Sequence, residues 1–159
     1  LAAFPGVLGS ADGLPAADTV EIADGVTFDP TVDGGENQSE AYLAYDGNPD
    51  TTWNSLRYNS PTYGMKDGLG FTVELADTAL VSSVTLDVAG EGGEVEIRLG
   101  DAADPSSGTV LAGGAMGSDV TYTFDEPVEA EAISLWFPEL PVADSDGRNR
   151  IELAEISLG

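Results

Sequence analysis

Oxygen-bearing side chains crowd into one short segment of this sequence, Asp46-Gly47-Asn48-Pro49-Asp50-Thr51. Gly47 permits a positive φ and Pro49 sets the next bend, so the segment, called the DG loop below, is predicted to form a tight turn. Calcium prefers about six to eight oxygen ligands at about 2.3–2.6 Å, and this loop supplies several of them. The alternative is an ordinary turn in which Asp46 accepts hydrogen bonds from neighbouring N–H groups without a metal.

A second group of chemically useful side chains follows the DG loop, within residues 53–66. The group combines aromatic rings with basic side chains and comprises Trp53, Arg57, Tyr58, Tyr63 and Lys66. Sites that bind sugars place aromatic faces against the C–H surfaces of the ring and use Arg or Lys as donors to hydroxyls. We therefore consider Arg57, Tyr58, Tyr63 and Lys66 candidate ligand-binding residues. The alternatives are that Trp53 and Tyr58 pack in the core and that Lys66 pairs with an Asp.

Signals of catalysis are weak. The sequence has no His and no Cys, which removes the commonest general base and the thiol nucleophile. It has no nucleophile-elbow or phosphate-loop pattern, and 29 acidic residues make any single carboxylate pair uninformative. The acidic run 144–149 does not fit an EF-hand, because placing Gly147 at position 6 puts Val142 and Leu153 at the two terminal ligand positions. The sequence predicts a protein that is not an enzyme.

Length and charge bound the remaining possibilities. The chain has 159 residues, which suits one domain, and it opens at Leu1 without a signal-peptide pattern, so we expect a piece of a longer protein. Residues 1–19 are rich in Ala, Gly and Pro and predict a linker or a loosely docked arm, followed by a domain over residues 20–159. A net charge of −24 disfavours nucleic acid and anionic membrane surfaces as partners, and no apolar run is long enough for direct membrane insertion.

Apolar and polar residues alternate along most of the chain after position 70, which is typical of half-buried strands. The predicted strands are Phe71–Leu75, Val81–Val88, Glu94–Leu99, Val120–Phe124, Ala132–Phe137 and Ile151–Leu158. A hairpin turn is expected at residues 91–93, and Glu40–Tyr45 is the only expected helical turn. Trp136 is expected in the core. Short strands at these spacings predict an all-β sandwich.

The DG loop and the last predicted strand together resemble a known family. The loop followed by Trp53 resembles the DG-x-x-x-T-x-W signature of discoidin-like domains, which include the coagulation factor 5/8 C-type domains and the family-32 carbohydrate-binding modules. The resemblance implies an all-β β-sandwich jelly roll of the galactose-binding-like type. It also implies a structural Ca²⁺ with the ligands Asp46, Asn48, Thr51 and Glu155, assisted by backbone carbonyls near Leu43 and Leu153.

A narrower resemblance rests on several short segments that occur in one order. They are Phe28-Asp29-Pro30, Asp33-Gly34-Gly35-Glu36-Asn37, the DG loop, Tyr58 and Gly64–Phe71. This order resembles the extracytoplasmic C-terminal domain of actinobacterial MviN/MurJ-like membrane proteins, although Met65 and Asp67 depart from the expected pattern. The resemblance implies an extracytoplasmic, wall-facing module of a membrane-anchored protein.

Two functions remain open at this point. The first is a non-catalytic binding domain that contacts cell-wall glycan, a peptidoglycan-related ligand or a protein partner through loops. The second is a structural or regulatory protein-interaction domain that binds no carbohydrate. Arg57 and Tyr63 discriminate between them: a shared open, concave surface formed by both side chains favours binding, whereas packing of both favours the second function.

Overall fold

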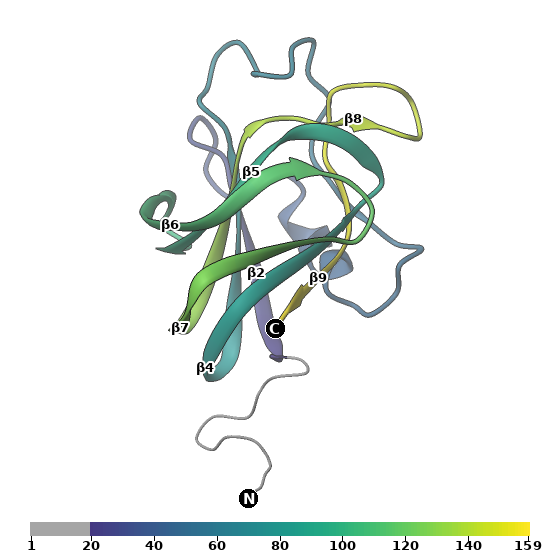
Figure 1. The fold of residues 1–159 in the computed structure, drawn as a ribbon. Coiled ribbons are helices and arrows are strands. Elements are labelled where there is room, and N and C mark those ends of the chain that lie inside the picture. Colours follow the sequence, from purple (N-terminus) through teal and green to yellow (C-terminus); the bar gives the residue numbers. More distant parts are fainter. Residues whose placement is uncertain (1–19) are drawn as a thin grey trace, which may run out of the picture.

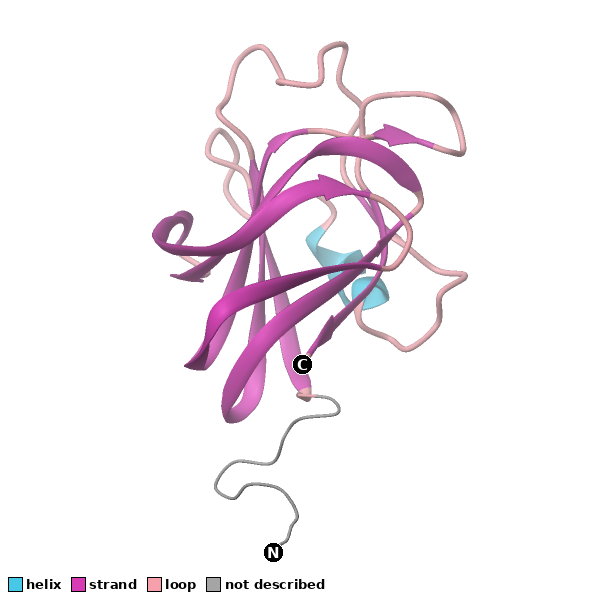
Figure 2. Ribbon diagram, in the orientation of Figure 1, coloured by secondary structure: helices cyan, strands magenta, loops and turns pink. Residues whose placement is uncertain are grey.

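The computed structural model describes residues 20–159, and these residues form strands with one short helix (Figure 1, Figure 2). The elements, in chain order, are β2 Ile22–Phe28, the 3-10 helix η1 Gln38–Ala44, β3 Trp53–Asn54, β4 Leu69–Val88, β5 Gly90–Asp101, β6 Asp104–Met116, β7 Val120–Glu139, β8 Val142–Ala143 and β9 Glu152–Leu158. Within this part of the chain, no helix is long and apolar enough to cross a membrane. The predicted arm over residues 1–19 lies outside the described residues.

Two long strands, β4 and β7, connect the two layers of the fold. The first half of β4 pairs with β2 on one side and with the second half of β7 on the other, and β5 and β6 continue this layer. The second half of β4 pairs with the first half of β7 and with β9, and β3 completes the other layer. All of these pairs are antiparallel, so both layers belong to one continuous ladder. The predicted β-sandwich is confirmed.

The core lies between the layers and follows from the alternation of side chains along each strand. In β4, Val84, Leu86 and Val88 are buried and the residues between them are partly exposed. In β7, Leu135 and Phe137 are fully buried in the same cluster. Trp53 is also buried there, as expected, with its ring edge-on to Phe71 at a centroid distance of 5.1 Å.

Several strand predictions need correction. The predicted strands at 71–75 and 81–88 are parts of one strand, β4, whose pairing with β7 is irregular between Glu74 and Ala79. The predicted hairpin at residues 91–93 is wrong, because β7 lies between β4 and β5, and the chain passes from one layer to the other at Ala89. The sequence analysis missed β2 and β6, and also the two-residue strands β3 and β8. In β6, Gly, Ala and Ser replace most of the apolar residues that would produce a clear alternation.

The two ends of the described chain lie at the same end of the sandwich, where the backbone N–H of Val20 donates to the carbonyl of Leu158 at 3.2 Å. The long loop before β4 and the segment around β8 lie at the opposite end (Figure 1). The expected helical turn at 40–45 is present as part of η1, which packs against β2, β3 and β9. The loops that carry the candidate residues are therefore supported by both layers.

Candidate functional site

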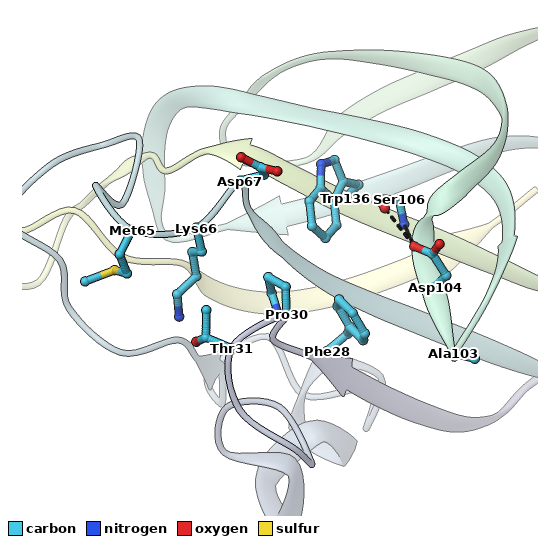
Figure 3. A pocket seen from close by; sticks show the side chains of 10 residues that line it. All are labelled: Phe28, Pro30, Thr31, Met65, Lys66, Asp67, Ala103, Asp104, Ser106 and Trp136. Carbon is cyan, nitrogen blue, oxygen red and sulfur yellow. Dashed lines mark hydrogen bonds between the residues drawn. The ribbon is translucent and has the colours of Figure 1, made fainter.

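A hollow of about 500 Å³ lies where the outer face of the β2–β4–β7–β5–β6 layer meets three loops. Its walls come from the end of β2, the segment after it, the loop before β4, the β5–β6 turn and β7 (Figure 3). The lining residues are Phe28, Pro30, Thr31, Met65, Lys66, Asp67, Ala103, Asp104, Ser106 and Trp136. The hollow therefore combines two aromatic rings with one ammonium group, two carboxylates and two hydroxyls.

The aromatic part of the hollow depends on two glycines, one just before β4 and one within it. Phe28 on β2 lies opposite Gly70 on β4, which lies opposite Trp136 on β7. Because Gly70 has no side chain, Pro105 occupies the space above it, and a Cβ at Gly70 would lie 2.3 Å from the Pro105 ring. A Cβ at Gly68 would similarly meet the indole of Trp136 at 2.8 Å. The centroids of the Phe28 and Trp136 rings are 6.3 Å apart, within the usual range for a packed aromatic pair, and Phe28 is partly exposed whereas Trp136 is 8% exposed.

Trp136 belongs to the wall of the hollow and not to the interior of the sandwich. Its neighbours Leu135 and Phe137 are in the core cluster, and strand alternation directs Trp136 to the opposite face. Trp136 is 8% exposed, so the expected burial is confirmed, but it lies outside the main cluster between the two layers.

Lys66 joins the hollow to a buried polar network. Its Nζ donates to Asp29 Oδ2 at 2.6 Å and to the Tyr58 hydroxyl at 2.9 Å, and it lies 3.5 Å from Glu36 Oε2. The exposed fractions of the Lys66, Asp29 and Glu36 side chains are 6%, 1% and 3%. The Tyr58 hydroxyl donates to Glu36 Oε2, and Glu36 Oε1 accepts from the backbone N–H of Leu56 at 2.7 Å. The network holds the chain after β2 against the loop before β4.

The surroundings of this network shift the pKa values of Asp29 and Tyr58 in opposite directions. Burial raises the pKa of Asp29, but hydrogen bonds from Lys66 and from the N–H and hydroxyl of Thr31 outweigh it, and the pKa lies below its usual value. The pKa of Tyr58 is strongly raised, first by burial and then by the hydrogen bond to Glu36. Lys66 is therefore an internal counter-ion for two carboxylates, in agreement with the pairing considered for it from the sequence.

Tyr58 and Tyr63, two of the predicted ligand-binding residues, lie in the core cluster. They are 9% and 4% exposed, and their rings meet edge-on at a centroid distance of 4.9 Å. The Tyr63 hydroxyl donates to the carbonyl of Phe137 at 2.7 Å, and burial strongly raises its pKa. Neither ring lines the hollow. Their burial argues against direct contact with a ligand and gives them a structural role under the hollow.

Arg57 lies elsewhere and is half exposed. Its Nε donates to Asp146 Oδ2 at 2.7 Å, and the same carboxylate oxygen accepts from Arg150 at 3.2 Å. The hydrogen bond from Arg57, followed by that from the backbone of Arg148, lowers the pKa of Asp146 to about 2. Arg57 and Tyr63 thus share no open concave surface, and they are not both packed. Of the four predicted residues, the structure brings only Lys66 to the hollow.

Three of the four predicted metal ligands, Asp46, Thr51 and Glu155, lie close together at the DG loop. Asp46 Oδ2 accepts from the Thr51 hydroxyl at 2.6 Å, and that hydroxyl is 3.0 Å from the Asn48 carbonyl oxygen. Glu155 reaches the same loop from β9, where its Oε2 accepts from the backbone N–H of Gly47 at 3.0 Å. Asn48 presents its carbonyl to this group, because its side-chain Oδ1 accepts from the N–H of Asp50 at 2.9 Å.

The donor set of the DG loop fits a hard cation. It contains two carboxylates, a hydroxyl and a carbonyl oxygen, the ligand types that Ca²⁺ prefers. Hydrogen bonds, first that from Thr51, lower the pKa of Asp46, whereas burial and then the contact with Asp46 raise the pKa of Glu155. No three His, Cys, Asp or Glu side chains gather as a metal group within residues 20–159, so the two carboxylates would need these neutral oxygens beside them. Leu153, whose carbonyl the resemblance also implied, lies in β9 opposite Trp53.

Comparison with solved structures decides which known fold this arrangement matches. The family-32 carbohydrate-binding module of AlyQ, in complex with 4,5-unsaturated mannuronic acid, is similar over 89% of this chain and 97% of that chain, with a TM-score of 0.58 and 19% identity. A pectin-binding module is similar over 89% and 92%, with a TM-score of 0.60 and 17% identity. The family-32 module of Clostridium perfringens NanJ, in complex with galactose, is similar over 85% and 90%, with a TM-score of 0.53 and 24% identity.

The fold is that of the family-32 carbohydrate-binding modules. The discoidin-like sandwich expected from the DG loop and the last strand is therefore confirmed as a fold. No family model matches the sequence. The fold accounts for the proximity of the DG loop and β9, whose contact joins residues 108 positions apart in the chain.

The sequence analysis did not select the residues that form most of the hollow, among them Phe28, Asp104 and Trp136. One signal was present: Leu135, Trp136 and Phe137 are three large apolar residues in a row. Successive residues of a strand point to opposite faces, so this run indicates a strand that is covered on both faces. A second was the Gly68-Leu69-Gly70 pattern, since glycines in a strand often mark close approach of another group. Neither signal identifies the covering loops, which come from distant parts of the chain.

Proposed function

We propose that this domain is a non-catalytic module that binds carbohydrate in the hollow beside Trp136. The observation that carries the proposal is a hollow with an apolar wall, formed by the partly exposed ring of Phe28 and the mostly buried ring of Trp136, next to polar side chains of three loops. Apolar ring faces suit the C–H surfaces of a sugar, and nearby carboxylates and hydroxyls suit its hydroxyl groups.

The size of the hollow supports this proposal. Its volume of about 500 Å³ falls within the range of about 300–1,000 Å³ that is usual for small-ligand sites, which are commonly apolar with a few fixed polar groups. The buried Lys66 network fixes the loops on one side, and the β5–β6 turn fixes Asp104 on the other, where its Oδ1 accepts from Ser106 Oγ at 2.7 Å. A preformed site loses less conformational entropy on binding.

The ligands named for similar folds point in the same direction. They include an unsaturated mannuronic acid, galactose and, for a module of a Paenibacillus sp. IK-5 chitosanase/glucanase with a TM-score of 0.55 and 18% identity, chitotriose. Because one fold binds such varied ligands, the glycan that this chain binds depends on the side chains of its own site. The resemblance to MviN/MurJ-like proteins further suggests an extracytoplasmic domain of a larger bacterial membrane or cell-surface protein, with cell-wall glycan or a peptidoglycan-related molecule as the ligand.

The test is a glycan array that includes peptidoglycan fragments, probed with the wild-type domain, Trp136→Ala and Tyr42→Ala. Tyr42 is 57% exposed on η1 and does not line the hollow, so it is a matched aromatic control. We expect glycan binding by the wild type and by Tyr42→Ala and its loss in Trp136→Ala. Because Trp136→Ala also removes packing, Asp104→Ala and Met65→Ala at exposed lining positions serve as milder variants. Absence of binding to every glycan, by a folded wild-type domain, would overturn the proposal.

A second candidate is a structural or protein-interaction domain. The burial of Tyr58 and Tyr63 and the pairing of Arg57 with Asp146 favour it, because these predicted ligand residues are used within the domain. This candidate expects a negative array and an unchanged phenotype when Trp136 is replaced in the full-length protein. It also expects loss of function when the loop surface around exposed Leu56 is changed.

A further inference from the structure

Met65 is the most exposed large hydrophobic residue in the part of the chain that the structure describes. It is 69% exposed, whereas the other methionine of the protein, Met116, is 4% exposed. Met65 lines the hollow, on the opposite side from Asp104 and Ser106 of the β5–β6 turn (Figure 3). A large apolar side chain left in water at the edge of a candidate site offers area that a bound ligand can bury.

The neighbours of Met65 in the chain hold it in this position. Tyr63, two residues before it, is buried, and its hydroxyl donates to a backbone carbonyl of β7 at 2.7 Å. Gly64 turns the chain with a φ of 95°. Lys66, the next residue, places its ammonium group 2.6 Å from the carboxylate of Asp29. Because the residues on both sides are anchored, the side chain of Met65 extends over the rim and does not reach the core.

A thioether differs from other apolar side chains because it can be oxidised. Its sulfur lone pair attacks the terminal oxygen of a hydroperoxide, so that an S–O bond forms and the O–O bond breaks. The sulfur loses two electrons, and the leaving oxygen gains them, takes the proton of the transferred OH group and departs as water or an alcohol. The protein has no cysteine, so no thiol competes for the oxidant. By exposure, Met65 is open to this reaction and Met116 is shielded from it.

The sulfoxide changes what the rim of the hollow offers to a ligand. The thioether is flexible and adapts to apolar surfaces, such as the C–H face of a sugar. Oxidation makes the same side chain polar and adds an acceptor oxygen that is hydrated in the free protein. A ligand that covers this oxygen must displace its water or leave the oxygen unpaired, and either costs binding free energy.

We propose that Met65 contacts the ligand of the hollow and that its oxidation to the sulfoxide by a hydroperoxide lowers the affinity for that ligand. This inference rests on the proposed carbohydrate-binding function and adds a regulated state of the same site. The change is reversible, because methionine sulfoxide reductases restore the thioether. Met116 belongs to the core cluster and stays reduced while the domain is folded.

The first measurement follows the two methionines separately. Trypsin releases Met65 in the peptide 58–66 and Met116 in the peptide 99–148, so mass spectrometry during treatment with hydrogen peroxide gives both oxidation rates. In the folded domain we expect Met65 to react about tenfold faster or more, because Met116 reacts only after local opening. In denaturant the two rates should be similar. Equal rates in the folded domain would overturn Met65 as the selective site of oxidation.

The second measurement applies the same treatment to binding. The wild type, Met65→Leu and Met116→Leu are titrated, before and after oxidation, with the glycan that gives the strongest signal on the array described above. We expect the affinity of the wild type and of Met116→Leu to fall about fivefold or more on oxidation. Met65→Leu should show no change on oxidation, whatever its starting affinity, because leucine cannot be oxidised in this way. Met116→Leu is the matched control, since this exchange nearly conserves core volume. A methionine sulfoxide reductase should restore the affinity of the oxidised wild type.

The melting temperature separates loss of binding from loss of the fold. Because Met65 is exposed, its oxidation should leave the melting temperature unchanged, and a lowered value together with lost binding would overturn the inference. Unchanged affinity after complete oxidation of Met65, or an equal loss in Met65→Leu, would overturn the regulation while carbohydrate binding stands. If the folded, untreated wild type binds no glycan on the array, the proposed function and this inference both fail.

Discussion

Two pairs of carboxylates in this domain meet opposite electrostatic surroundings. Asp29 and Glu36 are almost fully buried, and the Lys66 ammonium lies between them and the Tyr58 hydroxyl. Asp46 and Glu155 meet at the DG loop, where only N–H groups and the Thr51 hydroxyl donate to them. One pair has its counter-ion within the chain, and the other does not within residues 20–159.

The difference is visible in the acid strengths. Burial disfavours ionisation of Asp29, yet Lys66 and Thr31 more than offset it, so the pKa lies below the usual 3.8. At the DG loop, burial and the neighbouring Asp46 raise the pKa of Glu155 above the usual 4.5. The negative charge of the buried pair is thus compensated within the chain. At the DG loop, a proton or an external cation would reduce the repulsion between the two carboxylates.

The largest expected effect comes from the residue that joins the two regions. Trp53 follows the DG loop, and its indole N–H donates to the backbone carbonyl of Glu36 at 3.0 Å. Trp53→Ala is expected to lower the free energy of unfolding by about 3–5 kcal/mol, because a fully buried aromatic ring is removed. Denaturant unfolding measures the change, and Tyr42→Ala, an exposed aromatic, should stay within about 0.5 kcal/mol. A loss below about 1 kcal/mol for Trp53→Ala would contradict its packing role.

Replacing Lys66 tests whether the buried pair needs its internal counter-ion. Lys66→Met keeps the length of the side chain but leaves two buried carboxylates uncompensated, and a loss of about 3–5 kcal/mol in unfolding free energy is expected. The comparison is Arg57→Met, which breaks the solvent-exposed pair with Asp146 and should lower the unfolding free energy far less than Lys66→Met does. Equal losses in the two variants would show that burial does not set the importance of these ion pairs.

Calcium tests the DG loop. A cation that binds only the folded state at a hundredfold excess over its Kd stabilises it by about 2.7 kcal/mol. The melting temperature should therefore rise with millimolar CaCl₂ and fall with a chelator, and Asp46→Ala or Glu155→Ala should remove most of the difference.

Screening of so acidic a surface also stabilises the protein, so Mg²⁺ and NaCl of matched ionic strength are the controls. Equal stabilisation by the three salts, or an unchanged calcium response in both alanine variants, would leave the DG loop as a turn held by its own hydrogen bonds. In that outcome the two pairs of carboxylates differ only in that Asp46 and Glu155 repel each other without a counter-ion, and no metal site is involved.

The smallest expected effect is a dependence on pH. Because the folded state holds the proton of Glu155 more tightly than the unfolded chain, the free energy of unfolding falls as pH rises from about 4.5 through the raised pKa. Glu155→Gln cannot ionise and should lack this part of the slope when denaturant unfolding is measured across that window without divalent cations. If the unfolding free energies of the wild type and of Glu155→Gln depend on pH in the same way, Glu155 does not contribute to the pH dependence.

The sequence predicted best where the deciding contacts are local. The turn at Asp46–Thr51 follows from the backbone preferences of Gly47 and Pro49 and from side chains that bond to the N–H groups two residues on. The alternation through Val84, Leu86 and Val88 gave the buried face of β4. Glu155 was reached only through the resemblance to discoidin-like domains, because its contact with the loop spans most of the chain.

The sequence was misleading where a residue type suits two environments. An aromatic beside basic residues fits both a sugar platform and a core, and Tyr58 and Tyr63 proved to be core residues. Trp136 is buried, as predicted, but on the outer face of its layer, where it lines the hollow. The alternation in β7 separates two faces and does not tell which face the loops cover.

By itself, then, the sequence determined the all-β class, the DG loop and the acidic character, since these depend on backbone preference, side-chain period and charge. Only the tertiary structure decided that β7 lies between β4 and β5, that Lys66 neutralises Asp29 and Glu36, and that Phe28 and Trp136 meet across Gly70. Those outcomes depend on which distant segments share a layer and a face, and a strand's pattern specifies its two faces without naming its neighbours.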